Sequence, residues 1–196
     1  MHERYTIHDY QSIAEIKMHT MPFINKVISE GHAADMILVS EALQEKNLSR
    51  IAERIAADAQ KKVVLLAGPS SSGKTSTSKR LCIQLMTCRK HPVALSMDNW
   101  YINRADTPLD EYGKPDFESI YSIDLKQFHA DIASLMAGQE IMLPTYNFVT
   151  GMREYRGEKL RLTTNMILVI EGIHALNPMV SEQISPDSIF KIYAAP

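Results

Sequence analysis

The segment from Gly68 to Thr75 reads Gly-Pro-Ser-Ser-Ser-Gly-Lys-Thr, and it constrains the fold of this chain more than any other feature. It matches the pattern G-x-x-x-x-G-K-[ST], in which glycines allow a tight turn whose amide groups can surround a phosphate. The apolar run 63–67 before it is typical of a buried strand, and residues 76–88 after it have helical spacing. We expect Leu81, Ile83, Leu85 and Met86 to form the buried face of that helix. A loop of this kind between a strand and a helix predicts a nucleoside triphosphate site.

Each part of the loop has a predicted role in binding ATP. Lys74 can reach the β- and γ-phosphates, and the Thr75 hydroxyl can ligate Mg²⁺. The positive end of the following helix also favours a phosphate group. The alternative is a serine- and glycine-rich turn that only caps a helix. The residues expected to bind the nucleotide are Gly68, Pro69, Ser70, Ser71, Ser72, Gly73, Lys74, Thr75 and Ser76.

Composition and charge are those of an ordinary globular protein. The chain has 196 residues, 45% of them hydrophobic, and a formal net charge of −2, so nothing attracts it globally to nucleic acid or to acidic membranes. It contains no apolar run of membrane-spanning length and no signal-peptide pattern at its start, which predicts a cytoplasmic protein. Cys82 and Cys88 lie on different faces of the predicted helix and are expected to be free thiols.

Residues 1–60 read as a helical connector or appendage beside the nucleotide-binding part. Apolar residues recur there near helical spacing, and Asn47 or Ser49 could cap the last helix. The histidines of this segment lack the spacing of metal ligands, so we expect surface or core positions for His2, His8, His19 and His32.

The remainder, 61–196, alternates between predicted strands and helices. Further strands are expected at 93–97, 166–170 and 188–193, and a helix at 125–136 introduced by Asp124. This alternation predicts an α/β fold of three layers, a P-loop NTPase fold with a mainly parallel sheet. Ligands of such sheets bind beyond the carboxyl ends of the strands. Two long irregular stretches are expected, at 99–122 and 138–164, and such stretches are usually functional.

Two acidic residues come directly after predicted strands. Asp98 follows the strand at 93–97, and Glu171 follows the strand at 166–170. One carboxylate would orient Mg²⁺, and the other would accept a proton from a substrate hydroxyl or position that hydroxyl. The alternative, for Asp98 and for Glu171, is that the residue only caps a turn.

Four motifs, taken in order, resemble the phosphoribulokinase/uridine kinase family of P-loop kinases. They are 68–75, Ser-Met-Asp-Asn-Trp-Tyr at 96–101, Leu-Pro-Thr-Tyr-Asn-Phe at 143–148, and Val-Ile-Glu-Gly-Ile at 169–173. Asp-Phe-Glu at 116–118 and the run 150–157 are most similar to a bacterial subgroup of uridine kinase-like nucleoside kinases. In that subgroup the kinase follows a region similar to parts of threonyl-tRNA synthetase, and residues 1–60 resemble only the helical connector before the kinase.

The resemblance implies a role for each matching residue. Asp98 matches the carboxylate that accepts the proton of the nucleoside 5′-hydroxyl, and Glu171 matches the acidic residue associated with Mg²⁺. Glu118 matches an acidic residue that holds the ribose hydroxyls. The implied substrate-binding residues are Tyr101 beside the nucleoside, Glu118, Tyr146 and Phe148 lining the base pocket, and Arg153.

The sequence departs from the family pattern at three places. Gly151 aligns with a histidine that helps to read the pyrimidine edge, and Asn147 replaces an aspartate. A missing base-reading hydrogen bond weakens the expectation of pyrimidine specificity. Family members also continue into a lid with arginines over the phosphates, so we expect that the kinase part is truncated before this lid.

We therefore expect a kinase that depends on ATP and Mg²⁺, with Asp98 and Lys74 as catalytic residues and a nucleoside 5′-hydroxyl as the acceptor. A non-nucleoside acceptor, an ATP-dependent switch or RNA-associated module, and a catalytically silent fragment stay open as alternatives. The chain shows no basic face, which argues against a nucleic-acid partner. Related kinases associate, so a homo-oligomer is also expected.

Overall fold

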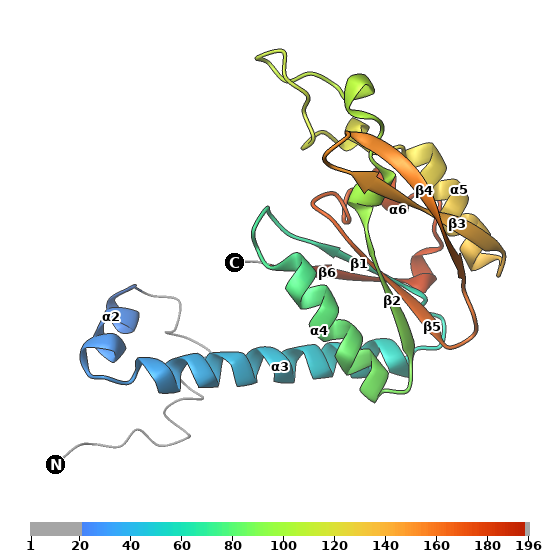
Figure 1. The fold of residues 1–196 in the computed structure, drawn as a ribbon. Helices are drawn as coiled ribbons and strands as arrows, with labels where there is room; N and C mark the ends of the chain where they lie inside the picture. The colour runs from blue at the N-terminus through green and yellow to red at the C-terminus, as the bar shows by residue number, and fades with distance from the viewer. Residues whose placement is uncertain (1–20, 195–196) are drawn as a thin grey trace. The chain divides into compact units, whose positions relative to one another are not determined.

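The computed structural model describes residues 21–194, which form two units divided between Arg50 and Ile51 (Figure 1). Helices α2 (Met21–Ser29) and α3 (Ala33–Ala57) cover most of the predicted helical segment. The predictions made for residues 1–20, among them those for His2, His8 and His19, lie outside the described residues. The predicted cap at Asn47 or Ser49 is wrong, because α3 continues through both residues. Strong helix formers flank them on both sides, so the helical hydrogen bonds continue past these two weak helix formers.

A parallel sheet forms the centre of the second unit. Its strands are β1 (Val63–Ala67), β2 (His91–Ser96), β5 (Met166–Glu171) and β6 (Ile189–Tyr193), in the order β2-β5-β1-β6. Every pair of neighbours in this sheet is parallel. All five residues of β1 and the last five of β5 are buried, as their continuous apolar sequence predicts for strands covered on both faces.

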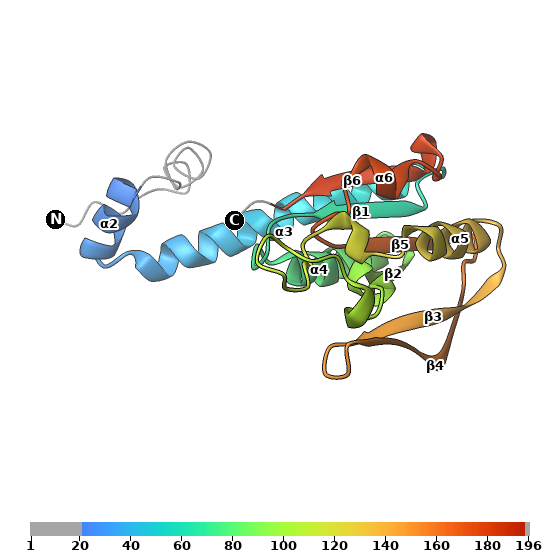
Figure 2. The same ribbon diagram turned by 90° about the horizontal axis from the view of Figure 1, so that it is seen from above.

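Helices cover the two faces of this sheet (Figures 1 and 2). Helix α4 (Lys74–Thr87) contacts β1, β2 and β5. On the opposite face, Val63, Leu65 and Ala67 belong to one core cluster with residues of α5 (Leu125–Met136) and α6 (Pro178–Ser181). Successive strand residues point to opposite faces, so alternate residues of one strand pack on the two sides of the sheet. The predicted three-layer α/β fold is confirmed.

The two predicted helices of this unit form, with differences in detail. Helix α5 begins after Asp124, whose side chain accepts a hydrogen bond from the Gln127 amide, as a capping residue should. Helix α4 begins at Lys74, two residues earlier than predicted. Its predicted buried face is half wrong. Leu81 and Leu85 are buried together with Ser78 and Cys82, four positions that share one side of a helix, whereas Ile83 and Met86 are exposed.

One irregular stretch was predicted wrongly. Residues 138–164 contain an antiparallel hairpin of β3 (Glu140–Asn147) and β4 (Met152–Arg161). The signal was weak because β3 contains Pro144, with a register irregularity beside it, and β4 is exposed at most positions and lacks apolar alternation. The other stretch, 99–122, contains only short 3₁₀ turns and isolated β-bridges and no longer helix or strand, as expected for an irregular segment. The 3₁₀ turns of the structure are η1 (Met97–Trp100), η2 (Arg104–Asp106), η3 (Ile120–Ser122) and η4 (Pro186–Ser188).

Both cysteines are free thiols, as predicted. Cys82 is buried, which raises the pKa of its thiol. Cys88 follows the last residue of α4 and is partly exposed. No helix among residues 21–194 has both the length and the apolar composition needed to cross a membrane.

Candidate functional site

The strand register brings three functional segments to one edge of the sheet. Leu66 of β1 and Ser96 of β2 both align with Glu171 at the end of β5. The loop from Gly68 follows β1 directly, and Asp98 lies two residues beyond the end of β2. Parallel strands end at the same edge, and this is where ligands of such sheets bind.

The loop between β1 and α4 is shaped by close backbone contacts. A β-carbon on Gly68 would overlap the carbonyl oxygen of Ala194, so only glycine fits there. Gly73 has a φ of 78°, in the left-handed region, and leads directly into Lys74 at the start of α4. The Lys74 ammonium donates a hydrogen bond of 2.8 Å to the Pro69 carbonyl, which holds it across the loop.

The loop fits a phosphate-binding role. The hydroxyl oxygen of Ser72 is buried without a hydrogen-bonding partner, although buried polar atoms are nearly always paired. Ser71, with a φ of 60°, lies in the left-handed region that turns successive amides into an anion-binding concavity. A nucleotide phosphate supplies the acceptor oxygens that such donors require.

Thr75 and Glu171 form the part of the site that fits Mg²⁺. The Thr75 hydroxyl donates a hydrogen bond of 2.9 Å to a carboxylate oxygen of Glu171, whose side chain is largely buried. Hydroxyl and carboxylate oxygens are the hard ligands that Mg²⁺ prefers, together with water and phosphate. Among residues 21–194, no cluster of three or more acidic, histidine or cysteine side chains could hold a metal ion by itself. The two residues therefore fit an ion that also binds the nucleotide.

Asp98 has a carboxylate with a perturbed pKa. Burial raises the pKa of Asp98 above its ordinary value of 3.8, and this effect exceeds the lowering by a hydrogen bond from Tyr101 and by the charge of Lys74. Burial and the neighbouring Asp98 carboxylate also raise the pKa of Tyr101, so its hydroxyl stays protonated. The hydroxyl carries a single hydrogen, for which the Phe117 carbonyl at 3.2 Å competes. The Asp98 carboxylate therefore holds a proton more tightly than an exposed aspartate does.

A cavity of about 260 Å³ is lined by seven of the sixteen predicted site residues. Asp98, Tyr101 and Glu118, which were predicted to bind or act on the acceptor, are among its lining residues. Three of its lining residues were not predicted as site residues, namely Phe117, Gly172 and Ile173, although they adjoin Glu118 and Glu171 in the motifs. The remaining lining residues are Ser70, Lys74, Thr75 and Glu171.

Aromatic rings extend this site toward the hairpin. Tyr101 contacts Phe117, Tyr146 and Phe148 edge to face, with ring centroids 5.6, 5.4 and 6.4 Å apart. Tyr146 is buried and its hydroxyl has no partner, whereas the Phe148 ring is 58% exposed. The two predicted base-pocket residues therefore do not line the cavity itself, and they join it through Tyr101.

Arg153 is engaged elsewhere in this structure. Its guanidinium pairs with the Asp124 carboxylate at 3.0 Å, and its amide donates to the Asn103 side chain. Asp124 is also the cap of α5, so Arg153 links β4 to that helix. It does not line the cavity.

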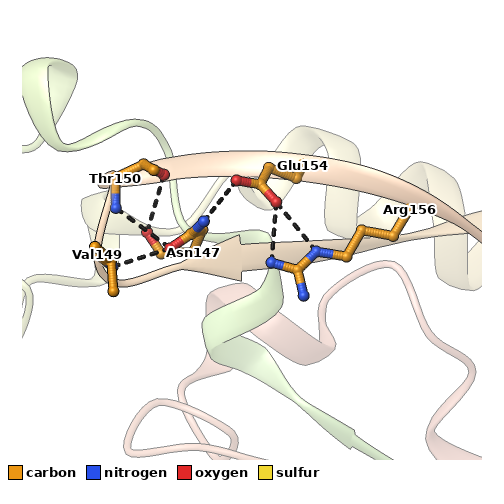
Figure 3. A network of polar contacts seen from close by, with 5 residues as sticks. All are labelled: Asn147, Val149, Thr150, Glu154 and Arg156. Atoms are coloured by element: carbon orange, nitrogen blue, oxygen red, sulfur yellow. Dashed lines mark hydrogen bonds and ion pairs between the residues drawn. The ribbon is translucent and has the colours of Figure 1, made fainter.

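Asn147 stabilises the turn of the hairpin (Figure 3). Its amide oxygen accepts hydrogen bonds from the amides of Val149 and Thr150 at 3.0 and 3.3 Å, and its amide nitrogen donates to Glu154 at 2.7 Å. Glu154 also accepts from Arg156. An aspartate at 147 could not donate and would place a second carboxylate beside Glu154. Asparagine is therefore explained by this local network.

Gly151 closes the same turn against Arg104. The glycine has a φ of 71°, and a β-carbon there would lie 2.8 Å from the β-carbon of Arg104. The Arg104 amide donates to the Gly151 carbonyl at 2.8 Å, and its guanidinium donates to the Phe148 carbonyl at 2.6 Å. The arginine thus fills the space over the turn, where a larger side chain at 151 would need to lie.

We expect Gly151→Ala to lower the free energy of unfolding by about 1–3 kcal/mol, because alanine is strained in the left-handed region. The total loss should be larger than this, because Arg104 must also shift. The control is Gly157→Ala, at a φ of 86° on the same hairpin with open space around the new β-carbon. Chemical denaturation should show a larger loss for Gly151→Ala than for Gly157→Ala. Arg104→Ala removes the contacts with the guanidinium but keeps the β-carbon, so it should narrow this difference without abolishing it. Equal losses for the two glycine variants would contradict the contact.

The chain is similar in sequence to a known protein family. Residues 63–196 match the profile of the phosphoribulokinase / uridine kinase family. A uridine kinase of Chloroflexus aurantiacus is 30% identical over 111 residues, which are 57% of this chain and 51% of that protein. A uridine kinase of Leuconostoc citreum is 24% identical over 115 residues, covering 59% of this chain and 54% of that one. The chain therefore spans about half the length of these relatives.

One solved structure is similar in fold. It is described as a possible uridine kinase from Bacillus stearothermophilus, and the superposition covers 76% of this chain and 79% of that chain. The TM-score is 0.61 at 22% sequence identity, a likeness that concerns the fold alone.

Proposed function

Because the chain belongs to the phosphoribulokinase/uridine kinase family, we propose that it transfers the γ-phosphoryl group of ATP to a hydroxyl of a small molecule. One observation carries this proposal: a cavity lined by the loop lysine, Lys74, is also lined by a half-buried carboxylate, Asp98. A phosphate-binding group and a proton acceptor are the two functions that such a transfer requires from a protein. The uridine kinases among the relatives make a nucleoside 5′-hydroxyl the first acceptor to test.

The residues of the loop would hold the triphosphate. Its amides and the Lys74 ammonium would bind the phosphate oxygens, and Thr75 and Glu171 would hold Mg²⁺. When bound, ATP and Mg²⁺ supply the phosphoryl group and neutralise its charge. Asp98 would accept a hydrogen bond from the acceptor hydroxyl and orient its oxygen, then take its proton. Positioning and electrostatics would account for most of the rate.

The rest of the cavity would select the acceptor. Glu118 offers a carboxylate for the vicinal hydroxyls of a ribose, and Tyr101 and Phe117 offer aromatic surfaces for a flat ring. Tyr146 has an unpaired hydroxyl at the edge of the same aromatic cluster. Phe148 would close the outer side, and Arg153 would act on the substrate only after leaving Asp124.

We assign the kinase core to residues 61–196 and a connector role to residues 1–60. The support is the long helix α3, which ends at Ala57 shortly before β1. A threonyl-tRNA synthetase-like region before this connector, cytoplasmic action and self-association belong to the same proposal.

The proposal is tested by measuring ADP release from the full-length protein with ATP and Mg²⁺, with and without each member of a nucleoside panel. A kinase should release ADP only when its acceptor is present. A switch or RNA-associated module should hydrolyse ATP equally with and without nucleosides, and that result would contradict the proposed function.

A further inference from the structure

Two residues of the short segment Asp116–Glu118, Phe117 and Glu118, line the cavity, yet the segment belongs to no helix or strand. Side chains hold its three consecutive carbonyl groups. The Asp116 carbonyl accepts from the Ser122 hydroxyl, and the Phe117 carbonyl accepts from Tyr101 at 3.2 Å. The Glu118 carbonyl lies 2.7 Å from the Nε2 atom of His174. The Asp116 amide also donates to the Pro108 carbonyl at 2.7 Å, and the Glu118 amide to the Asp116 carboxylate at 2.9 Å. The three carbonyl contacts therefore contribute, with these local bonds, to placing the Phe117 ring and the Glu118 carboxylate.

His174 differs from the other two because it comes from the nucleotide side of the site. It lies three residues after Glu171, in the turn that follows β5, and Gly172 and Ile173 between them line the cavity. Ser122, in contrast, is only six residues from Asp116, and Tyr101 is sixteen residues from Phe117, whereas His174 is 56 residues from Glu118. The contact between His174 and Glu118 thus ties the edge that would hold Mg²⁺ to the wall that would hold the acceptor.

The turn that carries His174 is itself well fixed. The Gly172 amide donates to the Leu66 carbonyl of β1 at 3.1 Å, and a β-carbon on Gly172 would lie 2.9 Å from Met97. The Asn177 amide donates to the His174 carbonyl at 2.8 Å. The imidazole therefore projects from a backbone that the sheet holds in place, and it can act as a fixed anchor for a less regular segment.

The chemistry of this contact determines the hydrogen position. A backbone carbonyl can only accept, so Nε2 of His174 must carry the hydrogen. Both the neutral Nε2–H tautomer and the imidazolium ion satisfy this condition. The hydrogen bond from His174 to the Glu118 carbonyl can therefore form in either charge state of the imidazole.

We infer that His174 is a positioning residue, which sets the acceptor-binding wall formed by Phe117 and Glu118 relative to the catalytic edge. The inference rests on the proposed function. His174 would act only through the Glu118 carbonyl, and its loss should impair use of the acceptor and leave nucleotide binding intact. Small misplacements of substrate-positioning groups have large kinetic costs.

The test compares His174→Leu, which removes the donor, with His174→Gln, whose amide nitrogen can replace Nε2 as a donor. His91→Leu is the matched control, because His91 lies at the start of β2, away from the carboxyl edge. In the full-length protein, His174→Leu should raise the KM for the acceptor about tenfold, the order of one lost hydrogen bond. The KM for ATP should stay unchanged, and His174→Gln should restore the acceptor KM to near the wild-type value.

Hydrogen exchange gives a readout that needs no turnover. Peptides covering residues 112–122 should exchange faster in His174→Leu than in the wild type, and peptides of α4 should not. Unchanged exchange in 112–122, or an unchanged acceptor KM in an active His174→Leu protein, would overturn the inference alone. A wild-type protein that phosphorylates no acceptor would overturn the proposed function and the acceptor role of His174 with it.

Discussion

Replacing Lys74 with alanine is expected to abolish phosphoryl transfer, with a loss of at least about 10³-fold in turnover. Lys74 is the cation of the phosphate-binding loop, and its ammonium already lies across the loop against the Pro69 carbonyl. Removing it deletes the positive charge that would offset charge on the transferred group. It also deletes the hydrogen bond that spans the loop, so ATP binding should weaken as well.

The control for this prediction is Lys79→Ala. Lys79 lies in the same helix and is exposed, and its replacement by alanine removes the same formal charge. Turnover should be near normal in the control and absent in Lys74→Ala, while circular dichroism shows both proteins folded. A Lys74→Ala protein with turnover comparable to that of Lys79→Ala would contradict the assignment of the loop.

The Asp98→Asn substitution should lower turnover by about 10²–10⁴-fold, the usual contribution of a general base, with little change in ATP affinity. Asparagine keeps the shape of the side chain and loses its capacity to accept a proton. Asp106→Asn, at an exposed aspartate of η2, controls for the change in charge. Turnover rates and nucleotide affinity measured on the same preparations separate the two effects. If Asp98→Asn kept normal turnover, Asp98 would not be the base.

The raised pKa of Asp98 adds a stability signature to the same variant. The folded state binds the Asp98 proton more tightly than the unfolded chain, so stability falls as pH rises from 3.8 through the higher folded-state pKa. At neutral pH the half-buried charge of Asp98 destabilises the folded state, and asparagine carries no such charge. Asp98→Asn should therefore have a higher melting temperature than the wild type near pH 7, and this difference should shrink as the pH approaches 3.8. The opposite trend would show that Asp98 is stabilised as a carboxylate.

The parts of the fold with a local cause were predictable from sequence. The start of α5 at Leu125 follows from Asp124, because a cap needs only its own side chain and the next turn. Strands β1 and β5 follow from apolar runs that two covered faces require. The hairpin of β3 and β4 was missed because β4 is stabilised by pairing and not by burial, so its sequence carries no alternation.

In the candidate site, too, residues with a local signal could be predicted, and contacts between distant parts of the chain could not. Gly68 to Thr75, Asp98 and Glu171 could be named because each lies at the end of a predicted strand, where the topology places ligands. Phe117 could have been found from its position beside Glu118. The contact of His174 with the Glu118 carbonyl could not, since it joins residues far apart in sequence through a backbone atom. Likewise, the pairing of Arg153 with Asp124 depends on how β4 lies against α5.

The central claim is the transfer of a phosphoryl group to a small hydroxyl compound. Its most direct test is to incubate the full-length protein with ATP, Mg²⁺ and a nucleoside panel that includes uridine and cytidine, and to identify the product by tandem mass spectrometry. We predict a nucleoside monophosphate with the phosphate on the 5′-oxygen, formed in equal amount to ADP. ADP without any phosphorylated nucleoside, or no reaction in a protein that binds ATP, would contradict the nucleoside kinase assignment.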